Sequence, residues 1–218
     1  RGNPDVRPTD ITAFDVRWEW YPSEAEMVTL AAFRKSYENP IERSFADLAG
    51  GDRTLNQMRN FESAEVTGIE AGTRLDLARR VGLPEGIYVQ ANAAFVDSTV
   101  TADDAGIATH TERPLQGQAP WVYNLQSGYD GDVWDLTVSL NVVGERLYQA
   151  GIQGLPDIYQ QPVAYLDLAA SYAFAERWTL KFKGQTLLDP DIEYTQGGRV
   201  YRTYQKGRDF SLSLAWKY

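Results

Sequence analysis

The residues able to do nucleophilic or metal chemistry are few in this chain of 218 residues, which has no cysteine and one histidine, His110. Without thiolates and with a single imidazole, neither a zinc site of Cys and His ligands nor a pair of His ligands can be assembled. His110 stands in a long polar stretch. It could contact a ligand or a metal there, but simple solvation is the better interpretation.

Acidic residues form three close pairs that could present carboxylates to Ca²⁺: Asp103 with Asp104, Asp130 with Asp132, and Asp189 with Asp191. None has the spacing of an EF-hand, and Asp is common in turns because its carboxylate bonds the local backbone. A turn is the better interpretation of each pair. The chain also lacks the Gly-x-Ser-x-Gly motif of a nucleophile elbow, so a hydrolase has little support. We expect no catalytic residues, no metal site and no cofactor.

The charge balance restricts the partners of the chain. The net charge is −9 and the pI is about 4.7. A nucleic-acid partner would require a basic footprint, so it is not expected. Arg79 and Arg80 could touch an acidic partner, but a solvated turn is the better interpretation of this pair too.

The elements that must position these residues alternate apolar and polar side chains. From Phe14 to Trp20, Phe, Val and Trp take every second position and charged residues take the others. A strand places the two sets on opposite faces, whereas a helix would scatter them. No stretch approaches the roughly 18 apolar residues of a membrane-spanning helix. Nine strands and no helix are predicted, with the faces of the second left open: Phe14–Trp20, Met27–Tyr37, Ile69–Leu75, Ile87–Phe95, Trp121–Leu125, Trp134–Val142, Leu166–Phe174, Trp178–Phe182 and Phe210–Tyr218.

The connections between the predicted strands alternate in length. Four are short: Pro22–Glu26, Ala78–Glu85, Asp130–Asp132 and Ala175–Arg177. Four are long: Glu38–Leu55, Ala102–Gln116, Gln149–Gln161 and Asp189–Lys206. Short turns on one side and long loops on the other are typical of an antiparallel transmembrane β-barrel.

Side-chain chemistry at the strand ends and on the polar face agrees with a barrel. Six aromatic residues stand near strand ends, as in an interfacial girdle: Trp20, Tyr21, Trp121, Trp178, Trp216 and Tyr218. The polar face would line a wet interior, where Glu70, Arg74, Lys181 and Lys183 would form ion pairs with neighbouring strands or with a plug. The alternative is a soluble β-sandwich, in which the apolar face packs against a second sheet.

Nine strands are an odd number, whereas bacterial single-chain barrels have an even number. A sheet of nine strands with two free edges would expose unpaired backbone groups to lipid. We therefore expect residues 1–218 to be the C-terminal portion of a larger barrel, with export specified in residues outside the sequence.

The order of short motifs resembles the TonB-dependent outer-membrane receptors. The opening Gly2–Pro8, with Trp18–Tyr21 in the first strand, resembles the family's "GNPDLKPE…yDLrwEwY" segment. The same order continues along nearly the whole chain in Phe33–Lys35, Asn39–Glu42, Asn60, Ala64, Gly68–Glu70, Pro120, Tyr123–Leu125, Gly144–Arg146, Leu166–Leu168, Leu187–Asp189 and Gly207–Phe210. Gln185–Thr186, in place of the usual Gln/Arg-Asn, and Tyr218, in place of the commoner terminal Phe, depart from the family pattern.

The resemblance implies a barrel of about 22 strands closed by an N-terminal plug, of which this chain would supply the last nine. It implies a Gram-negative outer-membrane protein, not an enzyme, that captures a small-molecule ligand, above all a ferric siderophore, at extracellular loops. Import would be driven by the TonB energy-coupling complex through the missing N-terminal part. The ligand-binding residues are unknown at this point. A passive porin-like channel is the alternative.

The resemblance also assigns a role to the end of the chain. Phe210, Leu212, Leu214, Trp216 and Tyr218 look like the C-terminal signal read by the barrel assembly machinery. Outer-membrane lipid, that machinery, the TonB complex and a metal chelate are therefore the expected partners.

Overall fold

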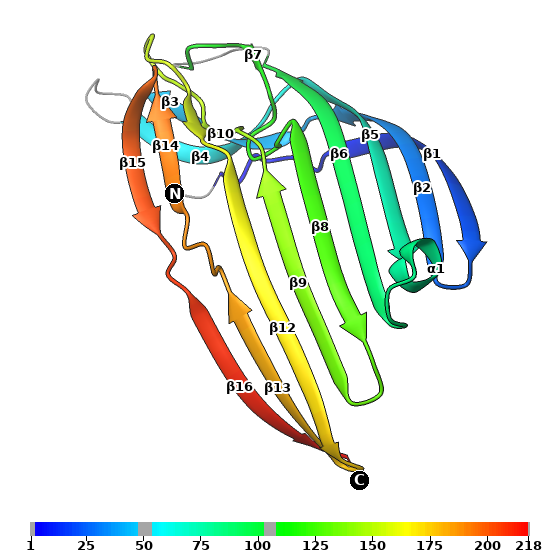
Figure 1. The fold of residues 1–218 in the computed structure, drawn as a ribbon. Coiled ribbons are helices and arrows are strands. Elements are labelled where there is room, and N and C mark those ends of the chain that lie inside the picture. The colour runs from blue at the N-terminus through cyan, green and yellow to red at the C-terminus, as the bar shows by residue number, and fades with distance from the viewer. Residues whose placement is uncertain (1–2, 48–53, 103–107, 218) are drawn as a thin grey trace.

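Nine long strands follow one another in a single curved antiparallel sheet, and a tenth short strand, β7 (Glu112–Arg113), pairs with β6 (Figure 1). The computed structural model describes residues 3–47, 54–102 and 108–217. In spatial order the nine strands are β1 (Asp10–Ser23), β2 (Glu26–Glu38), β5 (Ser63–Asp76), β6 (Ile87–Thr101), β8 (Trp121–Asp130), β9 (Trp134–Val143), β12 (Val163–Ala175), β13 (Trp178–Gln185) and β16 (Asp209–Trp216). All nine predicted strands are confirmed.

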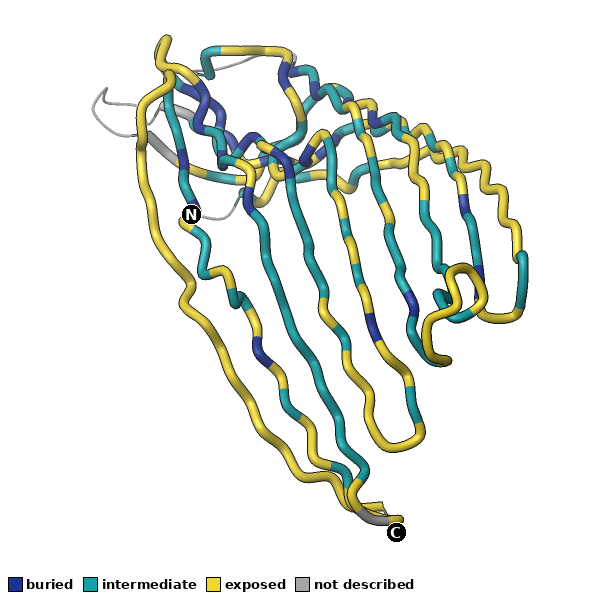
Figure 2. The backbone as a smooth tube through the Cα atoms, in the orientation of Figure 1, coloured by how far each residue is buried: buried dark blue, intermediate teal, exposed yellow. Residues whose placement is uncertain are grey.

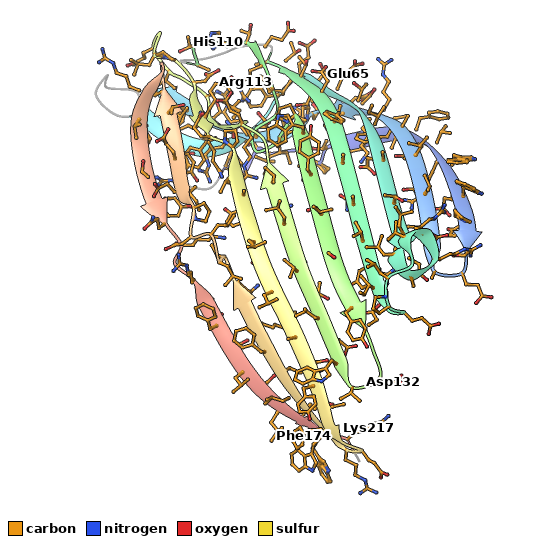
Figure 3. All side chains as sticks on the ribbon, in the orientation of Figure 1. Glu65, His110, Arg113, Asp132, Phe174 and Lys217 are labelled. Carbon is orange, nitrogen blue, oxygen red and sulfur yellow. The ribbon has the colours of Figure 1, made fainter. Side chains whose placement is uncertain are left out.

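The sheet is open, because β1 and β16 stand at its two edges and do not pair with each other. Tight turns lie at one end of the sheet, here called the turn end, where Figure 3 labels Asp132, Phe174 and Lys217. The long connections gather at the opposite end, here called the loop end, where Glu65, His110 and Arg113 are labelled.

One face of the sheet is apolar and open to the surroundings. Strand pairing carries Trp18 of β1 to Leu30 of β2, and Leu30 to Ala71 of β5. The apolar face therefore runs without interruption, which settles the orientation of β2. Its large side chains are uncovered; Phe14 is 69% and Leu212 68% exposed. A β-sandwich would bury this face against a second sheet, so that alternative is wrong for the described residues.

The other face, the polar face, carries amides, hydroxyls and charges that bond across strands. Asn92, Asn124 and Asn141 form a ladder over three strands, in which Asn124 Nδ2 donates to Asn92 Oδ1 at 2.7 Å and Asn141 Nδ2 donates to Asn124 Oδ1 at 2.5 Å. The amide groups of neighbouring strands therefore satisfy one another's hydrogen-bonding capacity across the sheet.

The prediction of no helix was wrong for one short segment, α1 (Leu77–Val81). Asp76 caps it by accepting a hydrogen bond from Ala78 N at 2.9 Å, and Gly82 ends it in the left-handed conformation at φ 71°. A helix of this length is too short to show a 3.6-residue period. Among the described residues, no helix has the length and apolar character needed to cross a membrane.

The long connections contain strands that alternation did not reveal. The first holds the hairpin of β3 (Ile41–Asp47) and β4 (Thr54–Asn60). β10 (Arg146–Gln149), β11 (Ile158–Gln160), β14 (Asp191–Gln196) and β15 (Arg199–Gln205) form a four-stranded sheet. Its residues Ile158, Ile192 and Tyr194 bury themselves with Val163 in a small core, and Figure 2 shows the buried residues concentrated at the loop end.

The segment Thr186–Pro190, here called the joint, leads from β13 to β14. It separates the sheet of nine long strands, here called the wall, from the four-stranded sheet. Thr186 and Asp189 have positive φ values of 55° and 46°. Asp189 Oδ1 accepts from Gly207 N at 3.0 Å, and Arg208 Nε donates to Leu187 O at 3.0 Å. These two bonds connect the segment between β13 and β14 with the segment between β15 and β16. At this level the hairpin that begins with β13 and ends with β16 is divided between the two sheets.

Candidate functional site

A cleft of about 750 Å³ opens at the loop end of the polar face. Ile11 and Tyr37 pair across β1 and β2 and form its floor on the polar side. The β3–β4 hairpin and the segment from Leu115 to Gln118 supply further walls, with Tyr148 of β10 at one side. The cleft combines tyrosine rings and aliphatic side chains with amide and charged groups, as small-molecule sites do.

A buried ion pair holds the walls of the cleft together. Arg113 Nη1 lies 2.6 Å from Glu42 Oε2, and their side chains are 3% and 6% exposed. Among the described residues, none donates a hydrogen bond to Glu42 Oε2, so its contact with Arg113 is electrostatic. Glu42 Oε1 accepts from Gln116 N at 2.8 Å. The β3–β4 hairpin is thereby fixed to the Leu115–Gln118 segment.

Tyr148 connects the cleft to a cationic and aromatic cluster on the four-stranded sheet. The Arg202 guanidinium carbon lies 4.4 Å from the ring centre of Tyr194, 5.4 Å from that of Tyr204 and 5.5 Å from that of Tyr148. Tyr194 stacks on Tyr204 at 6.2 Å and meets the edge of Tyr148 at 4.6 Å. Arg202 together with these tyrosines is called the Arg202 cluster below.

The surroundings keep the cluster cationic and hydrogen-bonding. Burial raises the pKa of the Tyr194 phenol, and its interaction with Tyr204 raises that pKa further. The Tyr194 hydroxyl donates to Gln160 Oε1 at 3.5 Å. Lys206 Nζ lies 5.3 Å from the ring centre of Tyr165, which packs against the same small core. Arginine above aromatic rings binds planar anions well, because its flat guanidinium both stacks and donates.

The structure gives His110 a partner in the next long connection. His110 Nδ1 lies 3.4 Å from Asp157 Oδ2, while 53% of the histidine side chain stays exposed. Asp157 also accepts from Gly151 N at 2.6 Å. His110 thus adjoins a structural carboxylate of a neighbouring loop. Among the described residues, no group of three or more acidic or histidine side chains is arranged to hold a metal ion.

The charged residues singled out in the sequence have mostly structural contacts. Arg74 Nη2 pairs with Asp130 Oδ2 at 3.2 Å, as expected of the polar face. Among the described residues, no ion pair forms at Glu70, Lys181 or Lys183. Asp189 bonds backbone in the joint, which agrees with the turn interpretation. Asp103 and Asp104 lie outside the described residues.

The solvated-turn interpretation was wrong for Arg80. Its Nε donates to Glu26 Oε1 at 2.7 Å and its Nη2 donates to Glu26 Oε2 at 3.2 Å. The Glu26 side chain is fully buried. The acidic partner of Arg80 is therefore in the same chain, and the pair secures α1 to the start of β2.

The residues of the expected assembly signal lie in β16, at the edge of the sheet. Phe210, Leu212, Leu214 and Trp216 all belong to the apolar face, paired with Gly184, Phe182, Leu180 and Trp178. They are between 49% and 68% exposed. Tyr218 lies outside the described residues. The role of these residues as an assembly signal stays a prediction.

The cleft and the Arg202 cluster were not found from the sequence. The cleft assembles from connections that are far apart along the chain. The Arg202 cluster joins three residues of the β14–β15 hairpin to Tyr148 of β10, and no fixed spacing relates Arg202 to Tyr148. The only local pattern is the run of Tyr and Arg in Tyr201–Tyr204, which by itself is a common strand composition.

Comparison with known proteins gives one family and one fold. The family model described as "TonB dependent receptor-like, beta-barrel" matches residues 1–187. An "Iron-regulated outer membrane virulence protein" of Vibrio cholerae serotype O1 is 22% identical over 98% of this chain and 32% of its own length. The chain thus spans about a third of the length of the curated relative.

Solved structures agree in fold. The copper transporter OprC matches with a TM-score of 0.70 and 17% identity, over 99% of this chain and 33% of that one. A ferric enterobactin receptor from Pseudomonas aeruginosa matches with a TM-score of 0.67 and 19% identity, over 99% and 32%. The siderophore receptor PirA from Acinetobacter baumannii matches with a TM-score of 0.67 and 16% identity, over 98% and 32%.

Proposed function

The chain belongs to the TonB-dependent receptor β-barrel family, and from that membership we propose that it forms part of the wall and outer loops of a receptor importing a scarce iron chelate. The protein is located in the outer membrane of Gram-negative bacteria and takes part in iron or siderophore uptake. Its family and its structural relatives are receptors and transporters, not enzymes.

We place residues 1–218 in the C-terminal portion of a barrel of about 22 strands. The open edges of β1 and β16 support this proposal, since an unpaired strand edge is not tolerated in lipid. Further strands would close the wall, and a plug would fill the interior against the polar face. The apolar face would contact outer-membrane lipid, and the barrel assembly machinery would insert the protein.

The observation that carries the ligand class is the Arg202 cluster beside the cleft. A guanidinium near three phenol rings suits a ligand with negative charge and a flat aromatic surface. Ferric siderophores of the catecholate type have both properties. We propose that such a chelate enters the cleft and that the TonB complex supplies the energy for its import.

Uptake of radioactive iron by cells making the full-length receptor tests the proposal. Arg202→Ala should raise the half-saturating concentration of a ferric catecholate at least tenfold, because a charged hydrogen bond contributes about 1.5–3 kcal/mol. The matched control is Arg199→Ala, at the tip of the same hairpin, which should leave uptake unchanged. Equal uptake by both variants would contradict the ligand class.

Removal of the TonB complex tests the energy source separately. Accumulation against a gradient should stop while binding to whole cells persists. If the chelate still enters without the complex, but only until its inner and outer concentrations are equal, the passive channel replaces the receptor as the explanation.

A further inference from the structure

A row of adjoining hollows, here called the trough, runs along the apolar face over β2, β5 and β6, from the loop end toward the turn end. The strands pair without irregularity, so each β5 residue lies between one residue of β2 and one of β6 on the same face. From the loop end the β5 members on this face are Ser63, Glu65, Thr67, Ile69, Ala71 and Thr73. The face thus changes from polar to apolar between Thr67 and Ile69.

The apolar part of the trough is built from short side chains with taller neighbours. Two hollows of about 490 Å³ and 370 Å³ share Leu30, Ala71 and Ala93 as lining residues. Ala71 and Ala93 pair across β5 and β6. Tyr123 and Leu125 rise beside the alanines on β8. A groove with apolar floor and walls therefore sits within the band that faces the membrane.

The apolar hollows lead directly to polar ones. A hollow of about 400 Å³ shares Ile69 and Phe95 with the apolar part. It shares Thr67 and Asp97 with a further hollow of about 520 Å³ at the loop end, where Figure 3 labels Glu65. The trough is therefore amphipathic along its length.

The polar part is rich in carboxylates and hydroxyls. Its described carboxylates are Glu38, Glu65, Asp97 and Glu112, accompanied by Ser and Thr hydroxyls. Arg34 lies beside them, with its Nη2 2.8 Å from Glu65 Oε1. Carboxylates and hydroxyls accept hydrogen bonds from sugar hydroxyls, whereas an unshielded phosphate would be repelled by this excess of negative charge.

We propose that the trough binds a glycolipid of the outer leaflet, with an acyl chain over Ala71 and Ala93 and a saccharide headgroup in the polar hollow. The order of the two parts fits a membrane whose headgroups lie toward the loop end. The proposal rests on the outer-membrane location and not on the identity of the imported ligand. Burial of methylene groups in the groove would favour the chain, and the carboxylates would select the headgroup.

Native mass spectrometry of the full-length receptor in detergent, stripped of lipid and then titrated, tests the proposal. The probes are a dephosphorylated acylated glucosamine disaccharide, phosphatidylethanolamine and phosphatidylglycerol. The glycolipid should be retained at least tenfold better than either phospholipid. Equal retention of phosphatidylglycerol would overturn the assignment of the headgroup.

Substitutions locate the site. Ala71→Trp fills the groove and should lower glycolipid retention at least tenfold, whereas Ala170→Trp, on the same face of β12, should leave it unchanged. Heat-modifiable gel mobility will show whether Ala71→Trp folds. If it does not, the smaller change Ala93→Leu takes its place and should weaken glycolipid retention. Asp97→Asn should weaken retention relative to Asp132→Asn at the turn end. An equal loss in both tryptophan variants would mean lipid bound all around the wall, and would overturn the proposal.

Discussion

Arg113 and Glu42 form a buried ion pair, 2.6 Å apart, between β7 and the β3–β4 hairpin. Arg113→Ala would leave a buried carboxylate without its partner, which costs about 3–5 kcal/mol. We expect the hairpin to lose protection in amide hydrogen exchange of the full-length receptor. Arg59→Ala on β4 is the control. The double replacement of Glu42→Leu and Arg113→Met should restore part of the protection. Undiminished protection in Arg113→Ala would show that the ion pair does not hold the cleft wall.

The assignment of the two faces can be tested on neighbouring residues of β9. Leu140 lies between Leu125 and Leu166 on the apolar face, and Ser139 points to the polar face. An arginine facing lipid near mid-membrane costs about 2–4 kcal/mol. Leu140→Arg should therefore lower the stability of the receptor refolded into vesicles, whereas Ser139→Arg should change it little. A larger loss in Ser139→Arg would reverse the faces.

Gly128 gives space to the ring of Tyr88. A Cβ at Gly128 would lie 2.5 Å from Tyr88 Cζ, so Gly128→Ala must displace the Tyr88 ring. The hydroxyl of Tyr88 accepts a hydrogen bond from Gln126 Nε2 at 2.8 Å, and its ring centre lies 3.8 Å from the Arg74 guanidinium carbon. We expect a loss of about 1–3 kcal/mol in unfolding free energy. In a Tyr88→Ala background the same substitution should have almost no effect. A penalty that persists there would point to backbone strain instead.

The end of the chain carries the prediction about assembly. Phe210→Ser or Trp216→Ser should reduce the amount of folded receptor in the outer membrane, because both remove apolar side chains from the strand that the assembly machinery is expected to recognise. Heat-modifiable gel mobility of membrane fractions measures this amount. Ser213→Ala, on the polar face of β16, is the control and should match the wild type.

The alternation of side chains predicted the wall well, because each of the nine strands is long enough to repeat its period several times. It left the faces of β2 open, since Ala31, Ala32 and Phe33 are consecutive apolar residues. Pairing with β1 and β5 assigns the two faces of β2, and this pairing can be seen only in the folded sheet. Helix α1 and the strands β7, β10 and β11 are too short to have a readable period. The strands β3, β4 and β15 have seven residues each, but their apolar and polar side chains do not alternate.

The cleft and the Arg202 cluster could not be predicted for a different reason. Tyr194 and Arg202 are partners across β14 and β15, but Tyr148 lies on β10, and its contact with them depends on how β10, β11 and β14 pair in register. The buried pairing of Arg113 with Glu42 likewise joins two different connections. Chemistry that depends on such meetings leaves no fixed spacing in a single sequence.

The joint after β13 makes the outer hairpin a replaceable module. Because Thr186–Pro190 ends the pairing of β13 with β16 before β14 begins, the register of the lipid-facing strands does not continue into the hairpin that bears Arg202. With the ligand site proposed above, insertions, deletions or exchanges in β14 and β15 would alter what the receptor recognises while the membrane-facing strands keep their alignment. The same wall could serve receptors for different cargo, and grafting an outer hairpin between relatives is a practical way to redirect one.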